Sequence, residues 1–320
     1  MADQQSDNDL FQPTSVEEAV RIVAGLAPPL DSPTQRRLRT RRHLDDAFGS
    51  GRRRPKWVWA ARNVAGEVTG GLAGIGSQQG APFGIDVMSL PPDPYEAARL
   101  VHWALGEARG HGFQEVSVFA PPDAGAHDAR VAPSTDALTD AGWRVFVERC
   151  HYEFPTADHR GGPAGFRPLL RLEQLTDAAD PRLAAVHRAA MAGTLDVHDA
   201  ATVDRAGFDA ACAEALDYLL EADPVDCIRL AHDDAGRVVG MVSFLAMPGG
   251  RAFVLFVGVA REHRGHHYAA ELVRLATEAL VDAGATVLIA DTDTTNRPMV
   301  RAFANAGWPR TETRIDFVPG

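Results

Sequence analysis

The sequence predicts an α/β fold made of two tandem domains, each a mixed, mostly antiparallel twisted sheet flanked by helices. Three observations support this. The chain has 320 residues, enough for two domains of ordinary size. Its two halves carry similar segments in the same order, and in each half apolar runs typical of strands alternate with stretches of helical periodicity.

The internal repeat is clearest in a predicted hairpin and in a later turn. "AARNVAGEVTGGLAGI" begins at Ala60, and the similar "LAHDDAGRVVGMVSFL" begins at Leu230. Each predicts a strand, an Ala-Gly turn and a second strand. The triplet Ala-Gly-Trp occurs at 141–143 and again at 306–308. We therefore expect one supersecondary plan to be used twice.

Each half is predicted to begin with two helical segments, at 16–27 and 34–48 in the first half and at 180–191 and 202–221 in the second. A hairpin, a third strand, a helix, a strand, a short helix and a last strand pair should follow. The Gly- and Pro-rich "DHRGGPAGFRP" predicts a linker. The expected domains are 1–157 and 169–320, with 158–168 between them.

Composition excludes several classes of function. A net charge of −11 argues against a nucleic-acid surface, and we interpret the basic runs Arg36–Arg42 and Arg52–Arg54 as solvated faces. The polar N-terminus does not resemble a signal peptide, and no apolar run approaches the ~20 residues that span a bilayer. The three cysteines have no zinc or redox spacing. We expect a cytoplasmic protein without nucleic-acid or membrane partners.

A candidate phosphate-binding loop, "EHRGHHYAAEL", starts at Glu262. The apolar residues 252–259 before it predict a strand, Arg264-Gly265 predicts a turn, and apolar residues recur at helical spacing from Tyr268. Such a loop points backbone N–H groups and the positive end of the helix dipole beyond the strand. This geometry suits a pyrophosphate.

Two motifs resemble the GCN5-related N-acetyltransferases (GNAT). The acyl-CoA loop of that family reads Arg or Gln, two residues, Gly, one residue, then Gly or Ala. Its six positions fall here on Arg264, Gly265, His266, His267, Tyr268 and Ala269. The later "NRPMVRAFANAGW" is similar to the family's Asn-containing segment, through Asn296, Met299, Phe303 and Gly307-Trp308. Tandem members such as mycothiol synthase have a similar two-domain plan.

The resemblance implies an N-acyltransferase, most simply an acetyltransferase. It would move an acyl group directly from acetyl-CoA, or another acyl-CoA co-substrate, to the amine of a small molecule. Val257 and Val259 would hold the pantetheine arm, and the loop 264–269 with Asn296 would complete the donor site. The first half has "SLPPDPYEAARL" in place of the loop, where three prolines lack N–H donors and Asp93 repels phosphate. We interpret this half as degenerate.

His267 departs from the family motif, which has glycine there. Histidine fits if φ is negative and its side chain turns away from the ligand, and we predict a helical φ because a helix begins here. His266 and His267 are interpreted as solvent-facing, although either imidazole could donate to a phosphate. His263 and His267 are four residues apart, but no nearby residue completes a metal set, so no metal is expected.

The catalytic groups are less defined by the sequence. Phe303 occupies the position where the family usually has a tyrosine acid, and phenylalanine cannot donate a proton. We name Asp291 as the candidate base, with Asp293, His187 and His198 as alternatives. For the two aspartates, helix capping in "DTDTTN" is the competing interpretation, and for His187 it is a place on an amphipathic helix.

Two other functions remain open. The donor could be the phosphopantetheine arm of an acyl carrier protein in a natural-product pathway, docked on the basic runs of the first half. Alternatively, the chain could be a non-catalytic acyl-CoA-binding module, because Phe303 cannot act as an acid.

Overall fold

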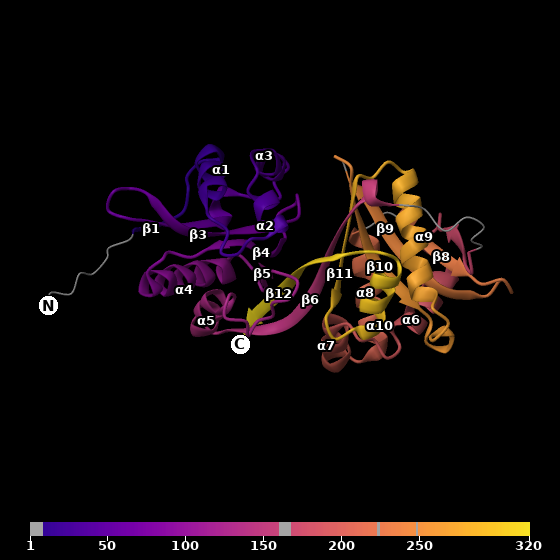
Figure 1. Cartoon of the computed structure of the whole chain (residues 1–320). Helices are drawn as coiled ribbons and strands as arrows, with labels where there is room; N and C mark the ends of the chain where they lie inside the picture. The colour runs from indigo at the N-terminus through magenta and orange to yellow at the C-terminus, as the bar shows by residue number, and fades with distance from the viewer. Residues whose placement is uncertain (1–8, 160–167, 223–224, 248) are drawn as a thin grey trace. The chain divides into compact units, whose positions relative to one another are not determined.

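The computed structural model describes residues 9–159, 168–222, 225–247 and 249–320. Contacts divide the chain into two compact units (Figure 1). Unit 1 comprises Met1–Arg149 and Glu312–Gly320, and unit 2 comprises Cys150–Thr311. We describe each unit separately.

Unit 1 is built on a sheet of strand order β1-β2-β3-β4-β5-β12. Of the pairs described, β4–β5 is parallel and the others are antiparallel. The strands are β1 (Asp9–Phe11), β2 (Val58–Arg62), β3 (Val68–Gly76), β4 (Pro82–Ser89), β5 (Val116–Ala120) and β12 (Arg310–Pro319).

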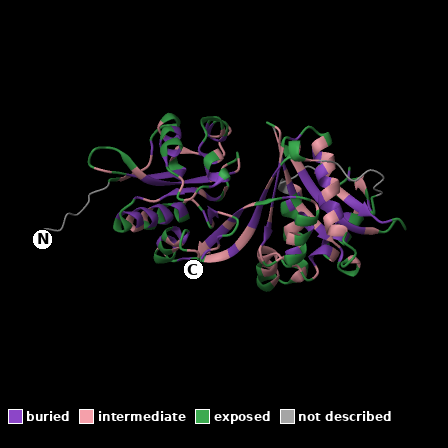
Figure 2. Cartoon of the chain, in the orientation of Figure 1, coloured by how far each residue is buried: buried purple, intermediate pink, exposed green. Residues whose placement is uncertain are grey.

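Helices cover both faces of this sheet (Figure 1). They are α1 (Val16–Gly25), α2 (Pro33–Leu38), α3 (Arg41–Gly49), α4 (Pro94–Gly110) and α5 (Ala132–Asp140). The alternation of β2 shows how the faces are separated: Val58 and Ala60 pack in the α1–α3 core, whereas Trp59 and Ala61 pack against α4. Burial follows this layering, with buried strands and exposed outer helix faces (Figure 2).

Unit 2 repeats the plan with strand order β6-β11-β10-β9-β8-β7. The pair β10–β11 is parallel, and the pairs from β10 to β7 are antiparallel. The strands are β6 (Trp143–Pro155), β7 (Arg171–Gln174), β8 (Ile228–His232), β9 (Val238–Met247), β10 (Arg251–Val259) and β11 (Val287–Asp293). The helices are α6 (Pro181–Met191), α7 (Val197–Ala206), α8 (Phe208–Ala222), α9 (Tyr268–Asp282) and α10 (Arg297–Asn305).

Two of the predicted helices are each split into two. The segment 34–48 becomes α2 and α3 because Thr40 is extended and its hydroxyl caps His43 N–H. The segment 202–221 becomes α7 and α8, and Gly207 between them has φ of +85°. The local breaks therefore follow ordinary capping chemistry.

The boundaries between the compact units lie within β6 and within β12, and they differ from the predicted domain boundaries. The predicted second domain includes all of β12, but Thr313–Phe317 pairs with β5, and Ile315 and Phe317 pack in a core of unit 1. Conversely, Tyr152 and Phe154 at the end of β6 pack in a core of unit 2. Residues 160–167, most of the predicted linker, lie outside the described residues.

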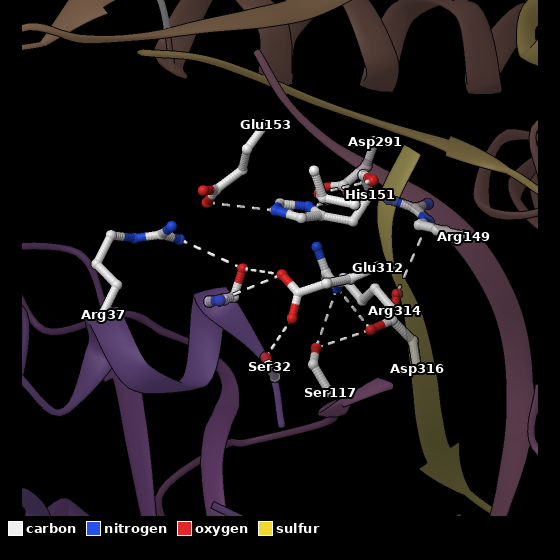
Figure 3. Close-up of polar contacts among 12 residues, drawn as sticks. Ser32, Arg37, Ser117, Arg149, His151, Glu153, Asp291, Glu312, Arg314 and Asp316 are labelled. Carbon is white, nitrogen blue, oxygen red and sulfur yellow. Dashed lines mark hydrogen bonds and ion pairs between the residues drawn. The ribbon is translucent and has the colours of Figure 1, made fainter. Parts of the chain in front are cut away.

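The exchanged end of β12 brings buried polar side chains into unit 1 (Figure 3). The Glu312 carboxylate accepts hydrogen bonds from Ser32 Oγ and from Thr34 N and Oγ1. Asp316 accepts from Ser117 Oγ at 2.7 Å and from Arg314 Nε at 2.8 Å. These bonds engage both Glu312 oxygens and Asp316 Oδ1, while Asp316 Oδ2 lies 3.7 Å from Arg149 Nε. Side chains therefore hold β12 as well as its ladder. No helix in the described part of the chain has both the length and the apolar character to cross a membrane.

Candidate active site

The site begins where β10 and β11 of unit 2 separate. The parallel register described for these strands ends at Phe253–Ile289, although β10 continues to Val259 and β11 to Asp293. On its other side, β10 shifts register against β9 between Val254 and Phe256. The second half of β10 therefore presents backbone groups toward the opening between the strands.

The predicted donor loop follows β10 directly. A single 3-10 turn, Arg261–His263, leads to Gly265, which has φ of +88°, and then to α9. The N-cap of α9 is His267, whose side chain makes no capping bond, and the first helical bond runs from Glu271 N to His267 O at 3.3 Å. The N–H groups of 268–270 thus lack intrahelical partners, as is typical of a helix start. They can receive an anion.

The predicted helical φ at His267 is wrong. Its φ is +62° and its ψ is 12°, in the left-handed region, and it is the one non-glycine residue with positive φ in the described chain. The loop must reverse before α9 can begin, and this reversal needs the conformation that glycine adopts most easily. A histidine there costs about 1–2 kcal/mol. The departure from the motif is therefore a strained residue.

Replacing His267 by glycine should consequently stabilise the chain by about 1 kcal/mol, because the backbone strain is relieved. Thermal or urea denaturation measures the change. His266→Gly is the control: its φ is not positive, so glycine there should only add unfolded-state entropy and lower stability slightly. Equal effects of the two variants would refute the strain at His267.

The Arg264 side chain attaches the loop to the end of α6 and to the end of β10. Its guanidinium donates to Ala190 O at 2.7 Å, Gly193 O at 3.2 Å and Val259 O at 3.3 Å. Burial, with the nearby Arg261 charge, lowers the pKa of Arg264. Glycine at 193 leaves room for the neighbouring Arg261, since a Cβ there would lie 2.8 Å from Arg261 Nη1. The motif arginine thus ties the donor loop to the end of α6 through carbonyl oxygens.

A cavity of about 650 Å³ lies between these elements. It brings together most of the predicted site residues: Val257, Val259, Arg264, Gly265, His267, Tyr268, Ala269, Asp291, Asn296 and Phe303. His266 does not line it, and its ring lies 5.6 Å from that of Tyr268. The cavity therefore joins the β10 edge, the start of α9 and the end of β11.

Comparison with known proteins agrees with this geometry. Residues 196–308, within unit 2, match the model of the acetyltransferase (GNAT) family. Residues 196–308 are therefore similar to a GNAT acetyltransferase domain. No curated protein matches the chain.

Two solved structures extend the GNAT fold to both units. One is a GCN5-related N-acetyltransferase from Sphaerobacter thermophilus, 15% identical with a TM-score of 0.60, and 97% of this chain aligns with 94% of it. Another is a tandem GNAT protein from the clavulanic acid biosynthesis pathway, 17% identical with a TM-score of 0.55, and 97% of this chain aligns with 98% of it. These likenesses concern the fold.

The residue predicted at the family's acid position is a buried aromatic side chain. Phe303 on α10 is 2% exposed and stacks on Tyr152, with ring centroids 4.4 Å apart. Burial raises the pKa of Tyr152, which keeps the phenol neutral. Asn296 lines the cavity and also caps α10, since its side chain accepts from Met299 N at 3.3 Å. The wall at α10 is thus built by packing and capping.

The predicted base Asp291 has a buried histidine beside it (Figure 3). Asp291 Oδ1 lies 2.8 Å from His151 Nδ1, and Glu153 Oε1 lies 3.6 Å from His151 Nε2. The alternative Asp293 is 1% exposed and accepts from Val197 N at 2.6 Å, which attaches the start of α7 to β11. The Asp293 side chain therefore makes a contact between distant segments, and the local cap of α10 is Asn296.

The two histidine alternatives do not line the cavity. His187 is buried against Phe256, with ring centroids 5.4 Å apart, and burial lowers its pKa. His198 donates its backbone N–H to Asp196 Oδ1 at 2.9 Å. His187 therefore belongs to helix packing, in line with its helix interpretation, and the His198 backbone belongs to the cap of α7.

Sequence reasoning missed one wall of the cavity. The segment from the end of α6 to the first turn of α7 contributes Gly193, Thr194, Asp196 and Asp199. The only sequence signal was the Asp-Val-His-Asp pattern, which is typical of a helix start. Asp196 does cap α7, but the pattern does not tell which carboxylate faces a ligand.

The corresponding region of unit 1 has no comparable loop. Asp93, the N-cap of α4, accepts from Glu96 N at 3.0 Å, so a carboxylate already occupies this helix start. Pro91 packs on β3, where a Cβ on Gly70 would lie 2.5 Å from Pro91 Cδ. These contacts place a negative charge and a proline where unit 2 presents N–H groups.

Proposed function

We propose that the chain is an N-acyltransferase that moves an acyl group, most simply acetyl, from an acyl-CoA thioester to the amine of a small molecule. The observation that carries the proposal is the uncapped start of α9 at the end of a cavity that continues along the diverging β10 edge. Its N–H groups suit the donor's pyrophosphate, and the β10 edge suits the amides of a pantetheine arm.

The residues present fit this donor. The walls of the cavity include apolar side chains such as Val257, Val259 and Met299, and no metal-binding cluster of His, Cys, Asp or Glu occurs among the described residues. The donor supplies an activated carbonyl and a thiolate leaving group. The chain's own residues would orient the thioester, exclude water and take a proton from the acceptor ammonium.

Two arginines of the basic runs in unit 1 are buried, which makes these runs a poorer docking surface for a carrier protein. This favours CoA as the source of the pantetheine arm. Arg53 is 1% exposed and donates to Gly74 O at 3.0 Å and to Asp86 Oδ2 at 2.8 Å. Arg39 is also buried and donates to Met88 O at 3.0 Å. Two arginines of these runs therefore hold unit 1 together, so the runs are not wholly the solvated faces expected.

Mass spectrometry of the reaction products tests the proposal. The chain is mixed with an amine panel and with either acetyl-CoA or an acetyl-loaded carrier protein. Acetylated amine from acetyl-CoA supports the proposal. Turnover from the loaded carrier alone would transfer the assignment to the carrier-dependent reaction, and acetyl-CoA binding without turnover on any amine would leave a non-catalytic binding module.

A further inference from the structure

We propose that Asp199, rather than Asp291, is the catalytic base that takes the proton from the acceptor amine. Asp199 lies in the first turn of α7 and lines the same cavity as Asp291 and the shifted segment of β10. The inference rests on the proposed N-acyl transfer and names a residue of that site that carries no family motif.

The position of Asp199 is fixed from two directions. The bond from Val197 N to Asp293 Oδ2, at 2.6 Å, holds the start of α7 against the end of β11. Asp199 N donates to Asp196 Oδ1 at 3.1 Å, within the capped first turn. A carboxylate on so constrained a turn has a defined place in the wall of the cavity.

The neighbouring carboxylates are committed to other partners. Asp196 Oδ1 accepts two backbone N–H groups, Asp293 holds Val197, and Asp291 lies 2.8 Å from His151 Nδ1. In the described part of the chain Asp199 accepts one long hydrogen bond, from Thr194 Oγ1 at 3.3 Å. Its remaining lone pairs are therefore available to an ammonium ion.

The surroundings of Asp199 also suit a base that works near neutral pH. Burial, and then the charge of Asp196, raises its pKa to about 6. The titratable groups that act on it are Asp196 at the cap, His198 on α7, Asp293 on β11 and Cys212 on α8. The other charged or titratable residues that line the cavity are His263, Arg264, His267, Tyr268, Asp291 and Arg301.

The step balances in atoms and charge. One ammonium proton passes to the Asp199 carboxylate, and the neutral amine forms a C–N bond to the thioester carbonyl carbon. The C–S bond breaks, and the second proton lost by nitrogen goes through water to the thiolate. Asp199 then releases its proton to solvent. The products are an amide and a thiol.

The test uses the full chain and an amine that the wild type acetylates. Asp199→Asn should lower kcat/KM by roughly 100- to 10,000-fold, with acetyl-CoA affinity unchanged by calorimetry. As the pH falls below about 6, protonation of Asp199 should lower the wild-type kcat/KM. This one-proton decrease should be missing in Asp199→Asn. Asp204→Asn, an exposed change on the same helix, is the matched control.

Stability gives a readout independent of turnover. A raised pKa means that Asp199 disfavours the folded state progressively as pH rises from about 4 through about 6. Asp199→Asn should therefore raise the melting temperature more at pH 7.5 than at pH 4.5. Two results would overturn this inference and leave the proposed function standing. One is an Asp199→Asn variant as active as an active wild type, and the other is loss of the pH dependence in Asp291→Asn but not in Asp199→Asn. A wild type that acetylates no amine would overturn the proposed function, and this inference with it.

Discussion

Replacing Ala269 with aspartate is expected to abolish tight binding of the acyl donor while leaving the fold intact. Ala269 is the second residue of α9 and lines the cavity. A carboxylate in the first turn of a helix is favourable by itself, because it complements the helix dipole. Beside a pyrophosphate it is repulsive: like charges about 4 Å apart cost ~2–4 kcal/mol near a protein surface, or roughly 30- to 1,000-fold in affinity.

Calorimetric titration with acetyl-CoA measures the affinity for the donor, and a melting curve shows whether the fold is intact. Ala210→Asp is the matched control, since Ala210 is an exposed residue in the first turn of α8 and does not line the cavity. The control should bind acetyl-CoA like the wild type. If Ala269→Asp kept the wild-type affinity for acetyl-CoA, the donor would not bind at the start of α9.

Replacing Arg264 with methionine is expected to weaken donor binding about tenfold or more and to lower stability by about 1–3 kcal/mol. The substitution deletes the bonds to the carbonyls of Ala190, Gly193 and Val259. The donor loop then loses its attachment to the end of α6, so its N–H groups are no longer preorganised.

Arg261→Met separates this attachment from simple loss of charge. Arg261 is an exposed cation of the same turn, and its removal should change stability by less than about 0.5 kcal/mol. Donor affinity is measured by calorimetry and stability by urea denaturation. If the two variants behaved alike, Arg264 would act only through its charge.

The residues that line the cavity at the start of α9 could be predicted from sequence because they lie in adjacent segments. A strand, a turn and a helix start are adjacent in the chain, so the motif and the periodicity together locate the loop and Asn296. The strand exchange could not be predicted, because β12 is continuous and nothing along it shows that Ile315 and Phe317 pack in unit 1 while the residues before Glu312 belong to unit 2.

Other features depended on contacts between distant segments. His151 and Asp291 lie on strands far apart in sequence, and their pairing has no local signal. At His267, a local rule failed: the helix start predicted a negative φ, but the loop reversal requires a positive one. Asp199 was missed because its surroundings come from α7, β11 and the cap at Asp196, and its sequence context indicates only a helix start.

The most direct test of the central claim, that the acyl donor binds at the start of α9 in unit 2, is amide hydrogen exchange with and without acetyl-CoA. We expect slower exchange in 265–271, where the N–H groups would bind the donor, and no change in 90–97 of unit 1, where Asp93 caps α4. Protection of 90–97, or no protection of 265–271 under saturating acetyl-CoA, would contradict the assignment of the donor site.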